Sequence, residues 1–289
     1  MTTQARIYMA CRELSDCVVL HPRFKEALTG IQQLVTQADV SGLPFGATVV
    51  GDSGSGKTTL MAALQRFVPA QDLLGERPSA LCLSAQSCPT IGDLLGKLIR
   101  QLGFPAAIRG NRISDQSLNL IAALKDRNIK ALFIQDFQHL YRGARDKSAA
   151  GITDWLKQLV EDAGVVIVLF GTPELGDLSH LNPQLHSRSP ARYRLTRFER
   201  NDEWIAFLQG MALRCKSIDW APIHQRYERE LHIVSDGLLR PLKQVLTAAA
   251  TIFIRDELQE LNSGVFAAAH QMVFGTDSSV PNPFLGRAK

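Results

Sequence analysis

The chain has 289 residues and a formal net charge of +4, with 45% apolar and 21% charged residues. These proportions are ordinary for a soluble globular protein. No apolar run approaches the roughly 18 residues that a membrane helix needs, so we expect no contact with a membrane. The mild positive charge permits contact with nucleic acid without requiring it. The five cysteines lack C-x-x-C spacing, which favours buried thiols in a reducing cytoplasm over a disulfide framework.

Residues 1–46 are expected to form an N-terminal helical segment. The sequence His21-Pro22-Arg23-Phe24 and residues 25–37 read as a cap followed by an amphipathic helix, because apolar residues recur every three or four positions. The short apolar run Ala47-Thr48-Val49-Val50 that comes next is typical of a buried strand.

The stretch after this strand carries the clearest functional motif. Residues 51–60 fit the pattern G-x-x-x-x-G-K-T without a mismatch and open onto a helix. Glycines in such a loop let successive N–H groups point at a phosphate. We expect ATP to bind Gly51, Asp52, Ser53, Gly54, Ser55, Gly56, Lys57, Thr58 and Thr59. Lys57 would reach the β- and γ-phosphates and the Thr58 hydroxyl would hold Mg²⁺; the alternative is a turn that only joins a strand to a helix.

Four further strands are predicted downstream, separated by helical patterns. The strands are 80–84, 129–134, 165–170 and 193–195, and the helices between them include 90–102, 115–127 and 154–162. This alternation over residues 47–198 indicates an α/β fold, a parallel sheet with helices on both faces. Only helical patterns follow, at 202–215, 223–235, 238–259 and 265–273. Residues 199–274 are therefore predicted as a small helical lid and 275–289 as a flexible tail.

Two strand ends carry candidate site residues. The third strand ends in Gln135 and Asp136, which are expected near Mg²⁺ and the phosphates because the carboxyl ends of parallel strands face the ligand. The alternative for Asp136 is a solvated residue that caps a turn. At the end of the fourth strand, Thr172 is placed to sense the γ-phosphate, unless its hydroxyl only caps a helix before Pro173.

Several arginines are candidates for contacts with the γ-phosphate. Arg188 and Arg192 belong to a basic run around the fifth strand, and one of them, Arg188 first, would act across a subunit boundary as an arginine finger. Arg240 opens the long lid helix and would swing onto the γ-phosphate when the lid closes. Each of these residues taken alone is also compatible with an ordinary surface charge.

With these residues assembled, the chain resembles the AAA+ ATPases of the TniB/TnsC family of transposition regulators. The matching pieces are His21-Pro22-Arg23-Phe24, Gly51–Leu60, Asp136-Phe137-Gln138-His139-Leu140, Phe170-Gly171-Thr172-Pro173, Leu185–Phe198 and Gly237–Leu246. The resemblance implies a P-loop AAA+ fold and a bacterial oligomer, a ring or helical filament on double-stranded DNA, with ATP and Mg²⁺ as cofactors. Such proteins carry a transposase to a target chosen by a target-selection protein, which is TniQ/TnsD-like or linked to CRISPR.

The resemblance also implies roles for individual residues. His21 and Phe24 would contact the nucleotide. The residues that face the DNA backbone in this family lie after the second strand, which points by position to Lys97, Arg109 and Arg112. Contacts of this kind give salt-dependent binding that is largely independent of sequence. The alternative for each of the three basic residues is a solvated surface position.

One departure from the family pattern concerns the end of the third strand. The family has Asp-Glu there, and this chain has Gln135-Asp136. An amide is a weaker partner for Mg²⁺ than a carboxylate, and Asp is one methylene shorter than Glu. ATP binding with slow hydrolysis is the prediction that follows.

Two other function classes stay open beside a transposition regulator that recruits and activates a transposase. The first is a helicase-loader or initiator-type ATPase on DNA; the 91 residues after Phe198 leave little room for the winged-helix domain of an initiator. The second is a small-molecule P-loop kinase, which needs a substrate pocket beside the phosphate loop and leaves the helical C-terminal third unexplained.

Overall fold

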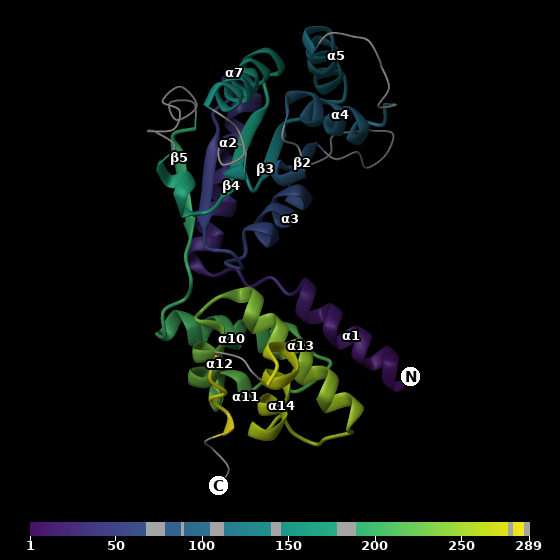
Figure 1. Cartoon of the computed structure of the whole chain (residues 1–289), viewed down its shortest axis with the longest axis vertical. Coiled ribbons are helices and arrows are strands. Elements are labelled where there is room, and N and C mark those ends of the chain that lie inside the picture. The colour runs from purple at the N-terminus through teal and green to yellow at the C-terminus, as the bar shows by residue number, and fades with distance from the viewer. Residues whose placement is uncertain are drawn as a thin grey trace. The chain divides into compact units, whose positions relative to one another are not determined.

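The computed structural model describes residues 1–67, 79–87, 90–104, 113–139, 146–177, 189–276 and 280–285. Its elements belong to two compact units, which are labelled in Figure 1. The sheet unit comprises Pro22–Ser53 and Lys57–Leu195, and the helical unit comprises Met1–His21, Gly54–Gly56 and Thr196–Lys289. The segment 1–46, which was expected as one piece, is therefore divided between the two units.

The sheet unit is built on five parallel strands in the order β2-β3-β4-β1-β5. The strands are β1 (Ala47–Gly51), β2 (Ala80–Ser84), β3 (Ala131–Gln135), β4 (Val166–Gly171) and β5 (Ala191–Leu195). Every residue of β1 and β4 is buried, as expected for strands covered on both faces. The predicted parallel α/β fold is confirmed, and each strand lies within two residues of its predicted position.

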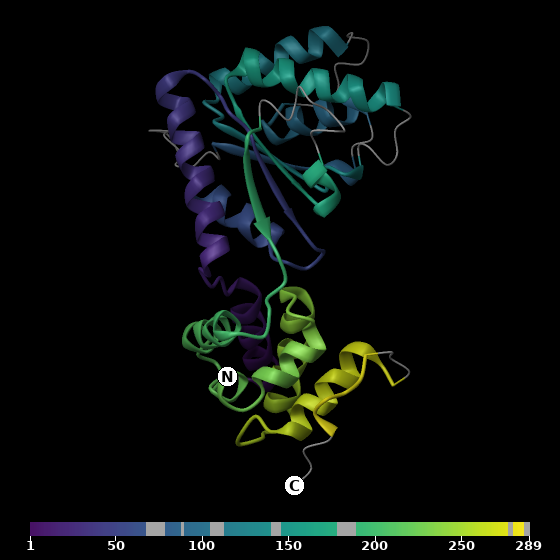
Figure 2. The same ribbon diagram turned by 90° about the vertical axis from the view of Figure 1, so that its left-hand side faces the viewer.

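Helices cover both faces of this sheet. On one face, α2 (Pro22–Ser41), purple in Figure 2, packs on α3 (Lys57–Phe67) and on β5. On the other face, α4 (Ile91–Gln101), α5 (Ile113–Asp126) and α7 (Asp146–Ala163) bury one apolar cluster against the strands. Two short 3-10 helices, η1 (Ala85–Ser87) and η2 (Pro173–Asp177), follow β2 and β4.

The start of α4 shows why this segment is helical. Thr90 Oγ1 accepts the Asp93 N–H at 3.2 Å, and the Asp93 carboxylate accepts the Thr90 N–H at 3.1 Å. The two residues form a capping box, which satisfies N–H groups that the first turn of a helix leaves unpaired. Thr90 is the first residue of the helix that the sequence predicts over 90–102.

The helical unit contains six helices in the described part of the chain. They are α1 (Thr3–Asp16), α10 (Asp202–Arg214), α11 (Pro222–Gln225), α12 (Glu228–Ser235), α13 (Leu239–Arg255) and α14 (Ser263–Phe274). The single helix predicted over 223–235 is wrong, because Arg226 leaves the helical conformation with φ at −123° and separates α11 from α12. Among the described residues, no helix combines the length and the apolar content that a bilayer crossing needs.

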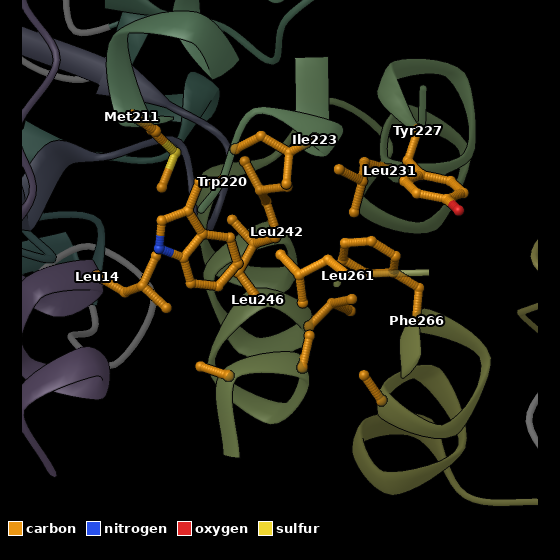
Figure 3. Packing of buried hydrophobic residues seen from close by; sticks show 14 of the residues in the cluster. Leu14, Met211, Trp220, Ile223, Tyr227, Leu231, Leu242, Leu246, Leu261 and Phe266 are labelled. Atoms are coloured by element: carbon orange, nitrogen blue, oxygen red, sulfur yellow. The ribbon is translucent and has the colours of Figure 1, made fainter. Parts of the chain in front are cut away.

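The core of the helical unit is apolar and aromatic. Figure 3 shows Trp220 beside Leu14 of α1, Met211 of α10 and Leu242 of α13, so one buried indole joins three helices. Its side chain is 2% exposed. Burial of large aromatic and aliphatic side chains is the main source of stability for a helical domain of this kind.

Part of the predicted tail belongs to this core. Phe284 is 2% exposed, and its ring stacks on Phe266 with a centroid distance of 5.3 Å. Asn282 Nδ2 donates a hydrogen bond to the Ala267 carbonyl at 3.0 Å. The expectation of a flexible tail therefore does not hold for residues 280–285.

Polar contacts over long sequence separations hold α1 in the helical unit. Glu13 Oε2 accepts the backbone N–H groups of Lys216 and Ser217, each at 2.9 Å. Lys243 Nζ donates to the carbonyls of Ser15 and Cys17, also at 2.9 Å, and so satisfies groups that the end of α1 leaves unpaired. Burial raises the pKa of the Glu13 carboxyl, but the hydrogen bonds from Ser217 and Lys216 outweigh it and leave the pKa below its usual value.

Candidate nucleotide-binding site

The phosphate loop lies between the end of β1 and the first residue of α3. Gly54 and Gly56 have φ values of +87° and +101°, a region that residues with a Cβ rarely adopt. Lys57 Nζ donates to the carbonyls of Gly51 and Asp52 at 2.7 and 2.8 Å. The loop therefore has the backbone that the glycine spacing predicts, and its lysine lies against the loop's own carbonyls.

Ser55 provides a test of whether this loop suits an anion. Its side chain is 4% exposed, and its Oγ has no hydrogen-bond partner among the described residues. A buried hydroxyl left without a partner costs about 1–3 kcal/mol, so a ligand oxygen that accepts its hydrogen bond would recover that cost. The loop fits a bound phosphate.

The end of β3 approaches the start of α3, although β4 lies between β3 and β1 in the sheet. Gln135 Nε2 donates to the Thr58 Oγ1 at 3.1 Å. The next residue, Asp136, has φ at +55°, a conformation that is uncommon without glycine and that often marks functional sites. Three predicted residues from two distant segments therefore meet at one edge of the sheet.

Thr172 lies at the end of the neighbouring strand, β4. Its backbone N–H donates to Gln138 Oε1 at 3.3 Å, and its carbonyl accepts the Leu175 N–H at 2.9 Å. The Thr172 hydroxyl is buried and has no hydrogen-bond partner among the described residues. The alternative prediction, a hydroxyl that caps the following helix, does not describe this geometry, and the unpaired hydroxyl suits contact with a ligand.

The side chains at this edge include oxygen atoms that could bind Mg²⁺. Thr58 supplies a hydroxyl, Asp136 a carboxylate and Gln135 an amide. No group of three or more His, Cys, Asp or Glu side chains is arranged to hold a metal in the part of the chain that the structure describes. A magnesium ion keeps several waters and is commonly held by one or two protein oxygens together with phosphates. These residues therefore fit magnesium bound together with a nucleotide better than a metal site formed by protein groups alone.

His21 and Phe24, the other predicted nucleotide contacts, are core residues. The His21 ring lies edge-on to Phe198 with a centroid distance of 4.8 Å, and its Nδ1 is 3.7 Å from Glu203 Oε1 within the helical unit. Phe24 is 2% exposed in α2 of the sheet unit. Their role toward a nucleotide stays a prediction.

The basic candidates that the structure describes lie on separate elements. Arg192 is exposed on β5, where it pairs in register with Thr48 of β1, and Lys97 is half-buried in α4. Arg240 is exposed at the start of α13, and its backbone N–H donates to the Gly54 carbonyl at 3.1 Å within the helical unit. Arg188, Arg109 and Arg112 lie outside the described residues.

Sequence reasoning missed two residues of this edge. Gln138 is 7% exposed and accepts the Thr172 N–H, and Gly171 gives its amide room, because a Cβ on Gly171 would lie 2.8 Å from Gln138 Oε1. The available signal was a polar residue two positions after Asp136, next to the buried Phe137.

Solved structures with similar folds include ORC proteins and a Walker-type ATPase. The ORC1 protein of Aeropyrum pernix in complex with DNA gives a TM-score of 0.68 at 17% identity, covering 90% of this chain and 67% of that chain. The ADP form of the ORC2 protein of the same organism gives 0.65 at 18% identity, with 85% and 67% covered. The Walker-type ATPase of Pyrococcus abyssi gives 0.54 at 11% identity, with 90% and 72% covered. These likenesses show the AAA+ P-loop fold that the resemblance implied.

The sequence itself identifies the family. A comparison with curated proteins gives no match. The family model described as bacterial TniB protein matches residues 13–200, which is more than half of the chain and includes the phosphate loop, β3 and β4. The chain therefore belongs to the TniB family and has the AAA+ P-loop fold of that group of ATPases.

Proposed function

We propose that this chain is an ATP-dependent regulator of DNA transposition, which assembles on double-stranded DNA and recruits and activates a transposase. One observation carries the proposal. In a member of the TniB family, the phosphate loop and two strand ends bring Thr58, Gln135 and the unpaired Thr172 hydroxyl to one edge of the sheet. That edge is where parallel α/β proteins bind their ligands.

The nucleotide is proposed to act as a switch. The glycine backbone, the Ser55 hydroxyl and the Lys57 ammonium bind the phosphates, while Thr58 and Asp136 hold Mg²⁺ with water and phosphate oxygens. The bound Mg²⁺ would neutralise charge on the β- and γ-phosphates. Because Gln135 offers an amide where the family has a carboxylate, hydrolysis is slow and the ATP-bound state persists.

Assembly on DNA is proposed to follow from the bound γ-phosphate. Arg188 or Arg192 of one subunit contacts the γ-phosphate of the nucleotide bound to its neighbour. Arg240 of the helical lid contacts the γ-phosphate bound to its own subunit. Lys97, Arg109 and Arg112 contact the DNA backbone, so binding weakens with salt and varies little with sequence. The proteins of similar fold include Drosophila ORC bound to DNA, with a TM-score of 0.58, which agrees with a role on duplex DNA.

Electron microscopy tests the proposal. The protein is imaged with duplex DNA and a slowly hydrolysed ATP analogue, with ADP, and without nucleotide, at matched concentrations. Rings or filaments only with the analogue and DNA support the proposal. A protein that stays monomeric in all three conditions would contradict it and would favour the kinase alternative.

An initiator-type or helicase-loader ATPase is the second candidate, because the similar folds include ORC proteins, one of them in an ADP form and one in complex with DNA. Both candidates bind ATP and DNA, so they differ in partner. Stimulation of strand transfer by a TniB-associated transposase, together with a TniQ/TnsD-like or CRISPR-linked target-selection protein, distinguishes the transposition regulator. Loading of a replicative helicase without such stimulation would favour the second candidate.

A further inference from the structure

The turn after β3 is joined to the end of β4 by two hydrogen bonds beyond the strand ladder. The Phe137 N–H donates to the Phe170 carbonyl at 3.0 Å. The Thr172 N–H donates to Gln138 Oε1 at 3.3 Å. The second bond is unlike the first, because a side chain takes the place of a backbone carbonyl.

The side chain of Gln138 is buried and fits the space beside Gly171. Its side chain is 7% exposed, and burial of an amide is costly unless its polar atoms are paired. A Cβ on Gly171 would lie 2.8 Å from Gln138 Oε1, so the absence of a side chain at 171 makes room for the amide. The buried Gln138 and Gly171 therefore fit one another in size and polarity.

The same contact determines where the Thr172 hydroxyl lies. The N–H of Thr172 is bound by Gln138 and its carbonyl by the Leu175 N–H, so the backbone is held on both sides. The hydroxyl alone has no partner among the described residues, although it is buried. A fixed backbone with an unpaired hydroxyl is preorganised for an acceptor that the protein does not supply.

We infer that Gln138 is a positioning residue, which holds Thr172 so that its hydroxyl meets the γ-phosphate and so lets the site distinguish ATP from ADP. Gln138 itself does not touch the nucleotide. The inference rests on the proposed nucleotide site and adds a residue on which the distinction between ATP and ADP depends.

The test is the ratio of the dissociation constants for ADP and for a slowly hydrolysed ATP analogue, measured by equilibrium titration. Gln138→Met removes the acceptor and keeps the length of the side chain, while Thr172→Val removes the hydroxyl and keeps its shape. Each is expected to reduce the ratio about tenfold, the loss typical of one hydrogen bond to a charged group. The double variant is expected to lose no more than either single variant, because the two residues act through one contact.

Two further variants keep the test decisive. Gly171→Ala places a methyl group against the amide and is expected to lower the ratio in the same direction. Gln138→Glu keeps an acceptor oxygen and is expected to retain discrimination better than Gln138→Met. Thermal melts establish that each variant is folded.

The outcomes separate the inference from the function on which it rests. If Gln138→Met and Gly171→Ala bind both nucleotides with the unmodified ratio while Thr172→Val does not, the inference is wrong and the nucleotide site stands. If the unmodified protein binds neither nucleotide, the proposed function fails and the inference fails with it.

Discussion

The attachment of α1 in the helical unit and the edge of the sheet at the ends of β3 and β4 use their polar groups in different ways. At the attachment of α1, the carboxylate of Glu13 and the ammonium of Lys243 join the helix to backbone groups. At the edge of the sheet, the Thr172 hydroxyl is buried without a partner among the described residues, and Asp136 keeps an uncommon backbone conformation. The polar groups of the first region thus stabilise the fold, whereas the Thr172 hydroxyl remains available to a ligand at some cost in stability.

The largest effect is expected in the core of the helical unit. Trp220→Ala should lower the free energy of unfolding by about 3–5 kcal/mol, because it removes a buried indole and leaves a cavity among three helices. Urea denaturation followed by circular dichroism measures it. Leu213→Ala is the matched control, since Leu213 is 62% exposed and its loss should cost little. Equal destabilisation by the two variants would show that packing around Trp220 does not support this unit.

The phosphate loop should show the opposite behaviour, with a large effect on binding and a small one on stability. Lys57→Ala is expected to weaken ATP binding about 100-fold, because it removes a charged donor to the phosphates. The free energy of unfolding should change by no more than about 1 kcal/mol. Lys125→Ala in α5, an exposed lysine, is the control and should bind normally. Retained binding in Lys57→Ala would remove the basis for the nucleotide site.

The unusual residue at the end of β3 gives a smaller effect. Gln135→Asp introduces a carboxylate at this position and should raise the ATPase rate about tenfold while lowering the Mg²⁺ concentration needed for nucleotide binding. Gln135→Asn, an amide of the same length as Asp, serves as the control. If the unmodified protein hydrolyses ATP as fast as Gln135→Asp does, the amide of Gln135 does not limit hydrolysis.

The smallest effect concerns the link between α1 and the rest of the helical unit. The folded pKa of Glu13 is lowered, so its contribution to stability is present above its usual value of 4.5 and is lost as the pH falls through the folded pKa. Glu13→Gln should cost about 1 kcal/mol at neutral pH and make stability less dependent on pH below 4.5. Glu257→Gln, at an exposed carboxyl, is the control. An unchanged pH profile in Glu13→Gln would contradict the assignment.

Much of the sheet unit could be predicted because its geometry follows from local patterns. Buried strands are short apolar runs, and a parallel sheet brings their carboxyl ends to one edge, so Gln135 is predicted near the phosphates and the Mg²⁺ that Thr58 would hold. In the structure the side chains of Gln135 and Thr58 are 3.1 Å apart. The glycine spacing of the phosphate loop likewise determined its backbone.

The remaining features depend on contacts that no local pattern encodes. Glu13 and Lys216 lie 203 residues apart in the sequence, and Gln138 and Thr172 lie 34 apart. The break at Arg226 and the packing of Phe284 depend on the tertiary fit of neighbouring helices, which overrides helix propensity and the polar composition of a tail. Fold class and motif could therefore be read from the sequence, but the residues that hold the motif in place could not.

The central claim is that a bound triphosphate couples copies of this chain to duplex DNA. Fluorescence anisotropy of a labelled duplex measures it directly, with the protein titrated in a slowly hydrolysed ATP analogue, in ADP and without nucleotide. We expect tight, cooperative binding with the analogue and binding at least about tenfold weaker in the other two conditions, with Lys57→Ala weak in all three. Equally tight, cooperative binding by the unmodified protein without nucleotide would contradict the claim.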